Sequence, residues 1–312
     1  MKKYAFGVDI GGTTVKIGLF ETSGKLAQKW EIPTRKETNG TKILPDIADS
    51  LAAKIDELGI SKDDVAGIGI DVPGPILDDE IVNRCVNLGW GVFNVAERVR
   101  TLTGISEVKV ANDANAAALG EMWQGGGENH QTLLWLPWGL VSAAALSPTV
   151  RLLPVPLVLL VKSVTSWLIR KKPSFAAAAR RATWNNMLLQ RGIARRAKEV
   201  LTSSNEPSAL RDIKDPDAKA VFDCAKDGDK LALEIVDFVG ETLGTALASV
   251  SCVFDPEVYV IGGGVSKAGQ ILIDTVQKHF VAAAFHASEG AEFALAKLGN
   301  DAGMYGAVKM VL

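Results

Sequence analysis

The run from Phe6 to Lys16 constrains the fold more than any other part of the chain. It reads Phe-Gly-Val-Asp-Ile-Gly-Gly-Thr-Thr-Val-Lys, so an apolar stretch ends in an acid, two glycines and two threonines before apolar residues return. This pattern predicts a strand, a tight turn and a second strand. Gly11 and Gly12 lack a Cβ, so backbone N–H groups in the turn can closely approach an anion.

Other polar residues make this turn a candidate phosphate site. The threonine hydroxyls add hydrogen-bond donors beside the glycine backbone, and Asp9 and Lys16 place a charge on each side of the turn. A glycine pair alone would fit an ordinary hairpin, but glycines, threonines and an acid together favour phosphate binding. The expected phosphate-binding residues are Asp9, Gly11, Gly12, Thr13, Thr14 and Lys16.

Length and composition narrow the class of protein. A chain of 312 residues can bury a substantial core and is expected to form two domains or lobes. The formal net charge of −2 argues against a general nucleic-acid binder. Three isolated cysteines, and an N-terminus that enters a strand almost at once, favour a reduced, cytoplasmic protein without a signal peptide.

Strand and helix patterns alternate outside the middle of the chain, which predicts an α/β fold. The expected elements of the first part are a helix over Lys42–Leu58, a strand over Val65–Ile70, a helix over Asn94–Thr103, a strand over Val108–Ala111 and a helix over Ala114–Met122. In the last part, an apolar stripe from Ile235 to Val250 predicts a long helix that ends at Asp255-Pro256. A strand over Val258–Ile261 follows, with a further helix starting near Lys267.

Three segments follow predicted strands, where α/β proteins bind ligands. Asp71-Val-Pro-Gly-Pro75 forms a rigid loop, although a simple Pro-Gly turn has the same pattern. Asn112-Asp113 opens a helix, so Asp113 is either a helix cap or a base that takes the proton of a substrate hydroxyl. Gly262-Gly263-Gly264 could hold a phosphate or adenosine at a helix N-terminus, a weak signal by itself.

These segments, together with others near the C-terminus, follow one another in the same order as in the ROK sugar kinases. The chain closely resembles that family, and most of all the bacterial glucokinases. The resemblance covers about 1–130 and 192–312, and it rests on Asp9–Thr13, Asp71–Pro75, Asn112–Glu121, Val260–Ser266 and Leu298–Ala307. It implies the two-lobed actin/hexokinase-like (ribonuclease-H-like) ATPase fold, an α/β fold. The implied lobes are 1–118 with a C-terminal helix over 300–312, and 119–299.

The resemblance also implies a role for each matching residue. Asp113 would be the catalytic base, and Gly74, Asn112 and Asp113 would bind the sugar. Asp9 to Thr13 would lie at the phosphates, and Gly262, Gly263 and Gly264 near the nucleotide. ATP and Mg²⁺ are the implied cofactors, glucose or a similar hexose the implied substrate, and a homodimer or larger homo-oligomer the implied assembly.

Residues 131–191 depart from the family. These 61 residues hold eight Lys or Arg but no Asp or Glu, and only one of the chain's 30 glycines. Family members carry here a Leu-Gly-Thr-Gly-Val-Gly-Gly-Gly phosphate loop, a Gly-Glu-Ile-Gly-His motif and a cysteine-rich zinc motif. Two glutamates in these motifs contact sugar. None of the three motifs is present, so we expect the zinc site to be lost and predict no metal ligands.

A shifted reading frame accounts for this segment. Read one base late, the codons TTG-GGG-ACT-GGT-GTC-GGC-GGC-GGC for the phosphate loop yield the observed Trp138–Ala145. Val158–Thr165 fits Gly-Ala-Ala-Gly-Glu-Ile-Gly-His in the same frame, and Trp184–Met187 fits Leu-Glu-Gln-Tyr. We infer a frameshift that enters near Leu133–Leu134 and leaves near Gln190–Gly192.

A membrane span and a natural insertion are the rival explanations. Leu133–Val161 is apolar and long enough to span, but four prolines interrupt it and Arg151 would lie in the hydrocarbon. An inserted module would not explain the agreement of the codons. We therefore expect neither a membrane nor a nucleic-acid partner.

The expected function is phosphorylation of glucose to glucose 6-phosphate by ATP, a glucokinase reaction of glycolysis in the cytoplasm. A ROK kinase for another hexose or an N-acetylated amino sugar is one alternative, and a non-catalytic sugar-binding or regulatory ROK protein is another. A repressor needs a DNA-binding domain, and none precedes Tyr4 in this sequence. Because the chain as written lacks the second phosphate loop, we expect little kinase activity from it and poor folding of 131–191.

Overall fold

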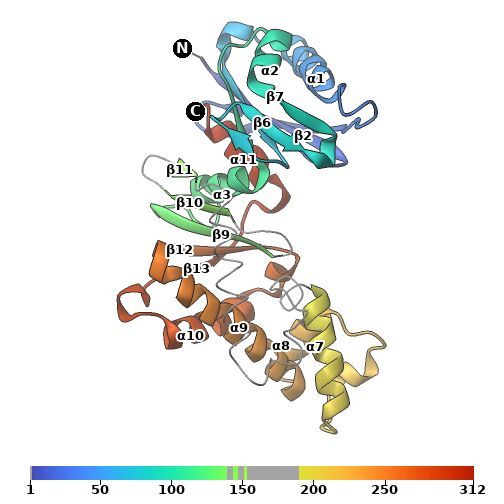
Figure 1. The fold of residues 1–312 in the computed structure, drawn as a ribbon, viewed down its shortest axis with the longest axis vertical. Coiled ribbons are helices and arrows are strands. Elements are labelled where there is room, and N and C mark those ends of the chain that lie inside the picture. Colours follow the sequence, from blue (N-terminus) through green and yellow to red (C-terminus); the bar gives the residue numbers. More distant parts are fainter. Residues whose placement is uncertain (1, 139–142, 147–150, 153–189) are drawn as a thin grey trace. The chain divides into compact units, whose positions relative to one another are not determined.

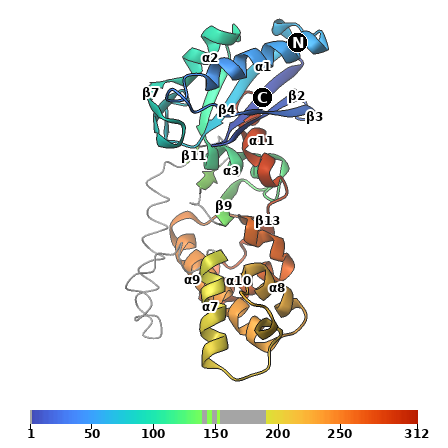
Figure 2. The same ribbon diagram turned by 90° about the vertical axis from the view of Figure 1, so that its right-hand side faces the viewer.

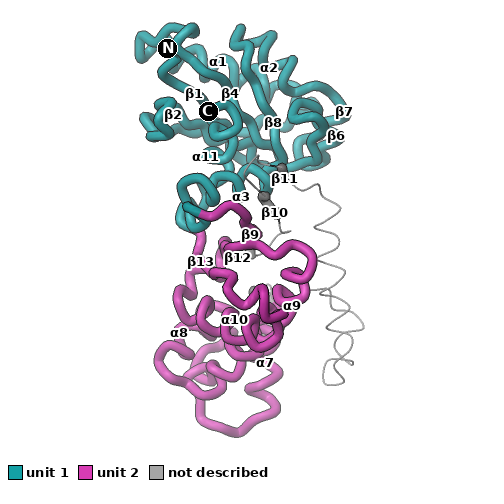
Figure 3. Tube along the Cα trace, turned by 90° about the vertical axis from the view of Figure 1, so that its left-hand side faces the viewer, with its two compact units in different colours: residues 1–129, 297–312 teal, residues 130–296 magenta. Residues whose placement is uncertain are grey.

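The computed structural model describes residues 2–138, 143–146, 151–152 and 190–312, which form two compact units. Unit 1 comprises Met1–Asn129 and Lys297–Leu312, and unit 2 comprises His130–Ala296 (Figure 3). The C-terminal segment thus returns to the unit in which the chain began. The lobe boundaries expected from the sequence stay a prediction.

A five-stranded sheet in the order β3-β2-β1-β4-β8 forms the centre of unit 1. The first three strands pair antiparallel, and β4 and β8 extend the sheet from β1 in parallel. The predicted strand, turn and strand at the N-terminus are therefore confirmed. The strands are β1 (Tyr4–Ile10), β2 (Thr14–Glu21), β3 (Leu26–Pro33), β4 (Val65–Val72) and β8 (Val108–Asn112).

Helices cover both faces of this sheet. Helices α1 (Ile43–Leu58) and α2 (Val95–Thr103) lie side by side on one face (Figure 1), where Phe6, Val8 and Ile10 of β1 join their core. On the other face lies α11 (Ala302–Lys309), which also packs against α3 (Asp113–Gln124). A small antiparallel sheet of β5 (Ile76–Leu77), β6 (Ile81–Cys85) and β7 (Trp90–Asn94) completes the unit.

Unit 2 has a second five-stranded sheet, in the order β11-β10-β9-β12-β13. Its helices α7 (Gln190–Ser203), α8 (Ala218–Lys226), α9 (Lys230–Phe254) and α10 (Gln270–Ala283) gather to one side of the sheet (Figure 2). Their apolar residues join those of β9 and β12 in one core. The strands are β9 (Thr132–Trp138), β10 (Ala143–Leu146), β11 (Arg151–Leu152), β12 (Val258–Gly263) and β13 (Glu292–Leu295).

The two sheets share one connectivity. In each, three consecutive strands pair antiparallel, and two later strands extend the sheet in parallel from the first of them. This repeat confirms the predicted ribonuclease-H-like α/β fold. It also places the β9–β10 connection, residues 139–142, at the topological position that the β1–β2 turn has in unit 1. Those four residues lie outside the described part of the chain.

The first residues of the anomalous segment form an ordinary core strand, whereas most of 131–191, for which poor folding is expected, lies outside the described residues. Strand β9 pairs in parallel with β12, and Leu133 to Leu136 are buried. A central parallel strand requires apolar residues on both faces, and this run supplies them whatever reading frame it comes from. The segments Val158–Thr165 and Trp184–Met187, which fit shifted family motifs, lie outside the described residues. No helix of the described residues is both long enough and apolar enough to cross a membrane.

The helix expected near Lys267 begins later. Residues Gly264–Ala268 form a short 3-10 helix, and α10 starts at Gln270. Gly269 separates the two with a φ of 79°, a left-handed conformation that a continuous α-helix does not contain. The glycine run therefore opens into a 3-10 turn rather than directly into a helix.

Candidate active site

Three neighbouring parallel strands of unit 1 end at the same edge of the sheet. Their register pairs Asp9 of β1 with Asp71 of β4, and Val72 of β4 with Asn112 of β8. Asp113 follows as the first residue of α3. The parallel pairing thus brings together an acid from each strand end, at the edge where α/β sheets bind ligands.

The β1–β2 turn is held by its own backbone and leaves its tip exposed. The Gly11 N–H donates to the Thr14 carbonyl at 3.0 Å, and the Thr34 hydroxyl donates to the Gly11 carbonyl at 2.8 Å. A Cβ on Gly11 would lie 2.8 Å from the Thr14 oxygen, whereas a Cβ on Gly12 would meet nothing within 4 Å. Gly12 and Thr13 are exposed, so an anion would meet the backbone there rather than at Gly11.

Lys16 is tied to Asp9 and to the C-terminal segment. Its Nζ lies 3.3 Å from Asp9 Oδ2 and donates to the Asn300 carbonyl at 2.7 Å. Lys29 on β3 makes a similar link, with its Nζ 2.8 Å from a carboxylate oxygen of Asp301. The segment that precedes α11 is therefore fixed beside the predicted phosphate residues by two lysines.

Two of the three residues predicted to bind the sugar, Asn112 and Gly74, contact each other. The Asn112 side-chain amide donates to the Gly74 carbonyl at 3.1 Å, while its Oδ1 accepts from the Ala114 N–H at 3.1 Å. Asn112 therefore both caps α3 and fixes the Pro-Gly loop. A Cβ on Gly74 would lie 3.0 Å from the Cβ of Cys85, so this position has little room for a side chain.

Asp113 is the first helical residue, not the cap. Its Oδ1 accepts the Ala114 N–H at 2.8 Å, and the residue is exposed to solvent. Desolvation by the surrounding protein raises the pKa of Asp113, the Ala114 hydrogen bond opposes that rise, and the charge of Asp9 adds to it. An accessible carboxylate with a raised pKa has the properties of a general base.

Glycines let α11 approach the sheet closely above this site. Gly67, Gly69 and Asp71 lie on one face of β4, since side chains alternate along a strand. A Cβ on Gly69 would lie 1.7 Å from the Ala307 carbonyl oxygen, and a Cβ on Gly303 would lie 2.9 Å from Asp71 Oδ2. From Gly69 to Asp71 the strand advances by two residues, and from Ala307 to Gly303 the helix runs over four. These two lengths are similar, so both contacts can form at once.

Asp71 is a site residue that sequence reasoning missed. It was expected only as the start of a loop, but its side chain is fully buried between Asp9 and the backbone of Gly303. The alternation Gly67, Gly69, Asp71 is the signal that places it on the face covered by α11. The alternation predicts the burial of Asp71 only when the position of α11 is known.

Glu121 is a second residue that the motifs did not explain. Its side chain is fully buried, and its carboxylate accepts backbone N–H bonds from Gly126 at 2.8 Å, Lys297 at 3.0 Å and Leu298 at 2.9 Å. Gly126 lies just before the chain leaves unit 1, and Lys297 is where it returns. One side chain therefore joins the two segments at which unit 1 is interrupted.

We expect Glu121→Ala to destabilise unit 1 by about 3 kcal/mol or more, because three N–H groups lose a charged acceptor. Urea unfolding followed by far-UV circular dichroism measures this loss. Glu37→Ala, which removes an exposed carboxylate in the same unit, is the matched control and should change stability by no more than about 0.5 kcal/mol. Equal losses for both variants would contradict the role given to Glu121.

The predicted nucleotide glycines lie in unit 2. A Cβ on Gly262 would lie 2.2 Å from the Trp135 ring, and Gly263 has a φ of 82°, so both positions require glycine. Gly264 lines a cavity of about 280 Å³ together with Phe222 and residues of α8 and the 3-10 helix. The remaining lining residues are Asp217, Ala218, Lys219, Asp223, Val265, Lys267 and Ala268.

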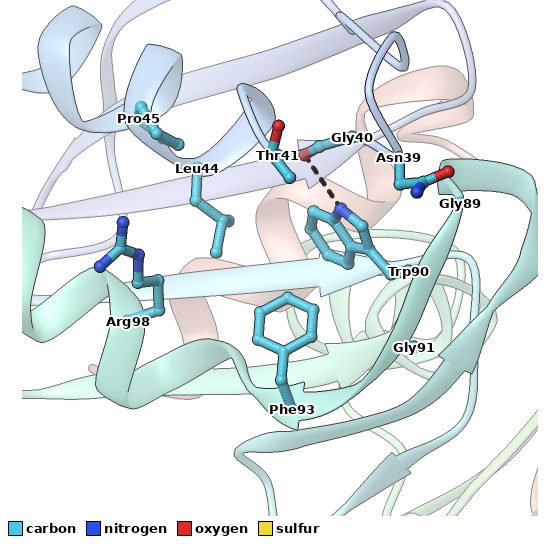
Figure 4. Close-up of a pocket in the computed structure, with 10 residues that line it drawn as sticks. All are labelled: Asn39, Gly40, Thr41, Leu44, Pro45, Gly89, Trp90, Gly91, Phe93 and Arg98. Carbon is cyan, nitrogen blue, oxygen red and sulfur yellow. Dashed lines mark hydrogen bonds between the residues drawn. The ribbon is translucent and has the colours of Figure 1, made fainter.

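A larger cavity in unit 1, of about 450 Å³, contains none of the predicted site residues (Figure 4). Trp90 and Phe93 form its wall, with ring centroids 5.2 Å apart in an edge-to-face arrangement. The Trp90 indole N–H donates to the Gly40 carbonyl at 3.1 Å, which ties the loop before α1 to β7. Leu44 and Arg98 complete the cavity from α1 and α2.

Comparisons with known proteins show what this chain is similar to. The model of the ROK family matches residues 5–139 and 175–312, so the unmatched stretch falls inside the anomalous segment. A glucokinase of Halalkalibacterium halodurans is 35% identical over 309 residues, covering 97% of this chain and 93% of the relative. A glucokinase of Thermotoga maritima is 28% identical over 311 residues, covering 98% and 96%. The crystal structure of a ROK family glucokinase from Streptomyces griseus, in complex with glucose and AMPPNP, matches with a TM-score of 0.63, 25% identity and 98% coverage of both chains.

Proposed function

Because the chain belongs to the ROK family, we propose that its gene encodes a sugar kinase that transfers a phosphoryl group from ATP to glucose. The observation that carries this proposal is the meeting of Asp9, Asn112 and Asp113 at one sheet edge beside the exposed β1–β2 turn. A phosphate site and a candidate base lie within one unit, as phosphoryl transfer to an alcohol requires.

The site supports one role for each residue. Asp113 takes the proton from the sugar hydroxyl as that oxygen attacks the γ-phosphate. Asn112 and Gly74, which are hydrogen-bonded to each other, position the sugar beside Asp113. Gly12 and Thr13 present their backbone to the phosphates, and Lys16 adds positive charge next to Asp9. Most of the catalysis in such a transfer is positioning and neutralisation of charge.

Each unit, taken by itself, has one feature that supports nucleotide binding. The turn tip at Gly12 is open, so a phosphate can approach its backbone without meeting a side chain. The cavity beside Gly264 has an aromatic side chain, Phe222, and is of a size that suits a purine ring system. The expected Mg²⁺ would arrive with the ATP and neutralise charge on its phosphates. A cytoplasmic location, a role in glycolysis and self-association stay predictions.

The repeated topology explains what the chain as written lacks. Residues 139–142 connect β9 to β10 at the position equivalent to the β1–β2 phosphate turn. Read in the family frame, codons 138–145 spell a glycine-rich loop there, which would supply a second phosphate turn. We therefore propose that the frame is shifted in this segment and that the literal chain lacks this second glycine-rich phosphate turn.

The experiment uses a restored chain, in which one base is inserted near codons 133–134 and one is removed near codons 190–192. Its phosphorylation of glucose, mannose, fructose and N-acetylglucosamine by ATP is followed through ADP release. We expect glucose to have the highest kcat/KM of the panel. A clear preference for another sugar would replace glucose as the proposed substrate. No phosphoryl transfer to any of these sugars would overturn the proposed kinase activity.

A further inference from the structure

The surroundings of Asp71 contain little that could stabilise a negative charge. The side chain is fully buried, and neither of its carboxylate oxygens has a hydrogen-bond partner among the described residues. Gly303 of α11 lies directly over it, with no side chain to offer. An ionised carboxylate in such a place would be costly, because nothing replaces the water it has lost.

The charged neighbours of Asp71 increase that cost. Asp9 on β1 is the register partner of Asp71, and a Cβ on Gly303 would lie 2.9 Å from Asp71 Oδ2 and 3.3 Å from Asp9 Cγ, so the two carboxylates face the same spot. Asp113 at the start of α3 adds a second negative charge. Lys16 on β2 is the one cation facing the group from the described elements packed around it, and its ammonium is already bound to Asp9 and the Asn300 carbonyl. Strand β8 contributes the uncharged Ala111 and Asn112.

Two carboxylates in contact can be accommodated if one of them carries a proton. A protonated Asp71 would gain an O–H donor, and the neighbouring acceptor is the Asp9 carboxylate, which Lys16 contacts on its other side. A proton on Asp71 would explain two observations together: Asp71 lies close to Asp9, and it has no other partner among the described residues. Burial first, and the charges of Asp9 and Asp113 next, hold the pKa of Asp71 well above its usual value.

We propose that Asp71 is a positioning residue, a neutral carboxylic acid that donates a hydrogen bond to Asp9 and fixes that carboxylate beside the phosphate turn. The inference rests on the proposed function only for its effect on catalysis. Asp71 itself touches no substrate in this account. It acts by orienting Asp9 and by keeping the total charge at the strand ends low enough for phosphates to approach.

The proposal gives a definite pH dependence. A raised pKa means that the folded state keeps a proton that the unfolded chain releases, so stability falls as pH rises from the unfolded pKa toward the folded one. The amide introduced by Asp71→Asn cannot ionise, yet its N–H can still donate to Asp9. The stability difference between Asp71→Asn and the parent should therefore grow in favour of the variant as the pH rises above the pKa of an unfolded aspartate.

The first test uses the full chain as written and needs no activity. Infrared spectroscopy at neutral pH should show a protonated carboxylic C=O band that disappears in Asp71→Asn, and urea midpoints should diverge with pH as described. Asp63→Asn, which changes an exposed acid of unit 1, is the control and should alter neither readout. A band that persists in Asp71→Asn, or a variant whose relative stability falls with rising pH, would overturn the proposal.

The second test uses the restored chain. Asp71→Asn should keep kcat within about threefold of the parent, while Asp71→Ala, which removes the donor, should lower kcat at least about tenfold. The parent should lose activity at alkaline pH as Asp71 ionises beside Asp9, and Asp71→Asn should lack that loss. A lower kcat in both variants, with unchanged pH profiles, would show a merely structural role. If the restored chain transfers no phosphate at all, the kinase proposal fails while the infrared result still decides the state of Asp71.

Discussion

Replacing Asp113 with asparagine should lower the kcat of the restored chain by about 10² to 10⁴-fold, the range that a positioned general base contributes. Asparagine has nearly the same shape, and its Oδ1 can still accept the Ala114 N–H that Asp113 accepts at 2.8 Å. The variant should therefore fold normally and retain its KM for glucose. Steady-state kinetics with urea unfolding on the same preparations separate the two effects.

The pH profile gives a second check on Asp113. A base must be deprotonated to act, and the pKa of Asp113 is raised by desolvation and by Asp9. Activity should therefore fall on the acidic side at a higher pH than a free aspartate would produce. Asp63→Asn, an exposed acid in the same unit, should leave kcat unchanged. If Asp113→Asn retained more than about a tenth of the parent kcat, Asp113 would not be the base.

Replacing Gly306 with alanine should destabilise unit 1 by about 3 kcal/mol or more. Its Cβ would lie 1.6 Å from the Ala116 carbonyl oxygen on α3, and backbone atoms cannot turn aside as a side-chain end can. Helix α11 would have to move away from α3. Gly303 would then leave its place over Asp9 and Asp71, so the restored chain should also lose activity.

The matched control for Gly306→Ala is Gly91→Ala, in the same unit. A Cβ on Gly91 would meet nothing within 4 Å, so this substitution should change the urea midpoint little. Gly69→Ala tests the same contact from the other side, because its Cβ would lie 1.7 Å from the Ala307 oxygen. A small effect of both Gly306→Ala and Gly69→Ala would contradict the close packing of α11 on this unit.

Local signals in the sequence were enough for most elements of the fold. The helix predicted over Lys42–Leu58 was found as Ile43–Leu58, ending where Gly59 takes a φ of 61°. The long helix ended at Asp255-Pro256 as expected, with Asp255 in a left-handed conformation at its C-cap. In both cases a few neighbouring residues determine where the helix ends, so periodicity and turn residues are sufficient to predict it.

Contacts between distant parts of the chain could not be predicted in this way. Glu121 binds the Lys297 and Leu298 N–H groups, 176 and 177 residues further along, and no local pattern shows that pairing. The sequence predicts only that Asp71 follows a strand, because its burial depends on the packing of α11. The predicted helix start near Lys267 falls in a 3-10 turn, since a 3-10 turn and an α-helix begin with similar residues.

The anomalous segment shows how tolerant a core strand is of its exact residues. Leu133 to Leu136 are buried in β9 although they lie at or beyond the inferred entry of the frameshift. Burial there requires apolar side chains of suitable size, and the residues present supply them. A phosphate loop has no such tolerance, because its function needs glycine at particular positions.

The measurement that tests the account most directly is the rate of phosphoryl transfer from ATP to glucose by the literal and the restored chains, side by side. Both proteins should first be checked by intact mass. The account predicts glucose 6-phosphate from the restored chain, at a rate at least about a hundredfold above that of the literal chain, whose second phosphate turn is missing. A literal chain of confirmed mass that phosphorylates glucose as fast as the restored one would contradict the account.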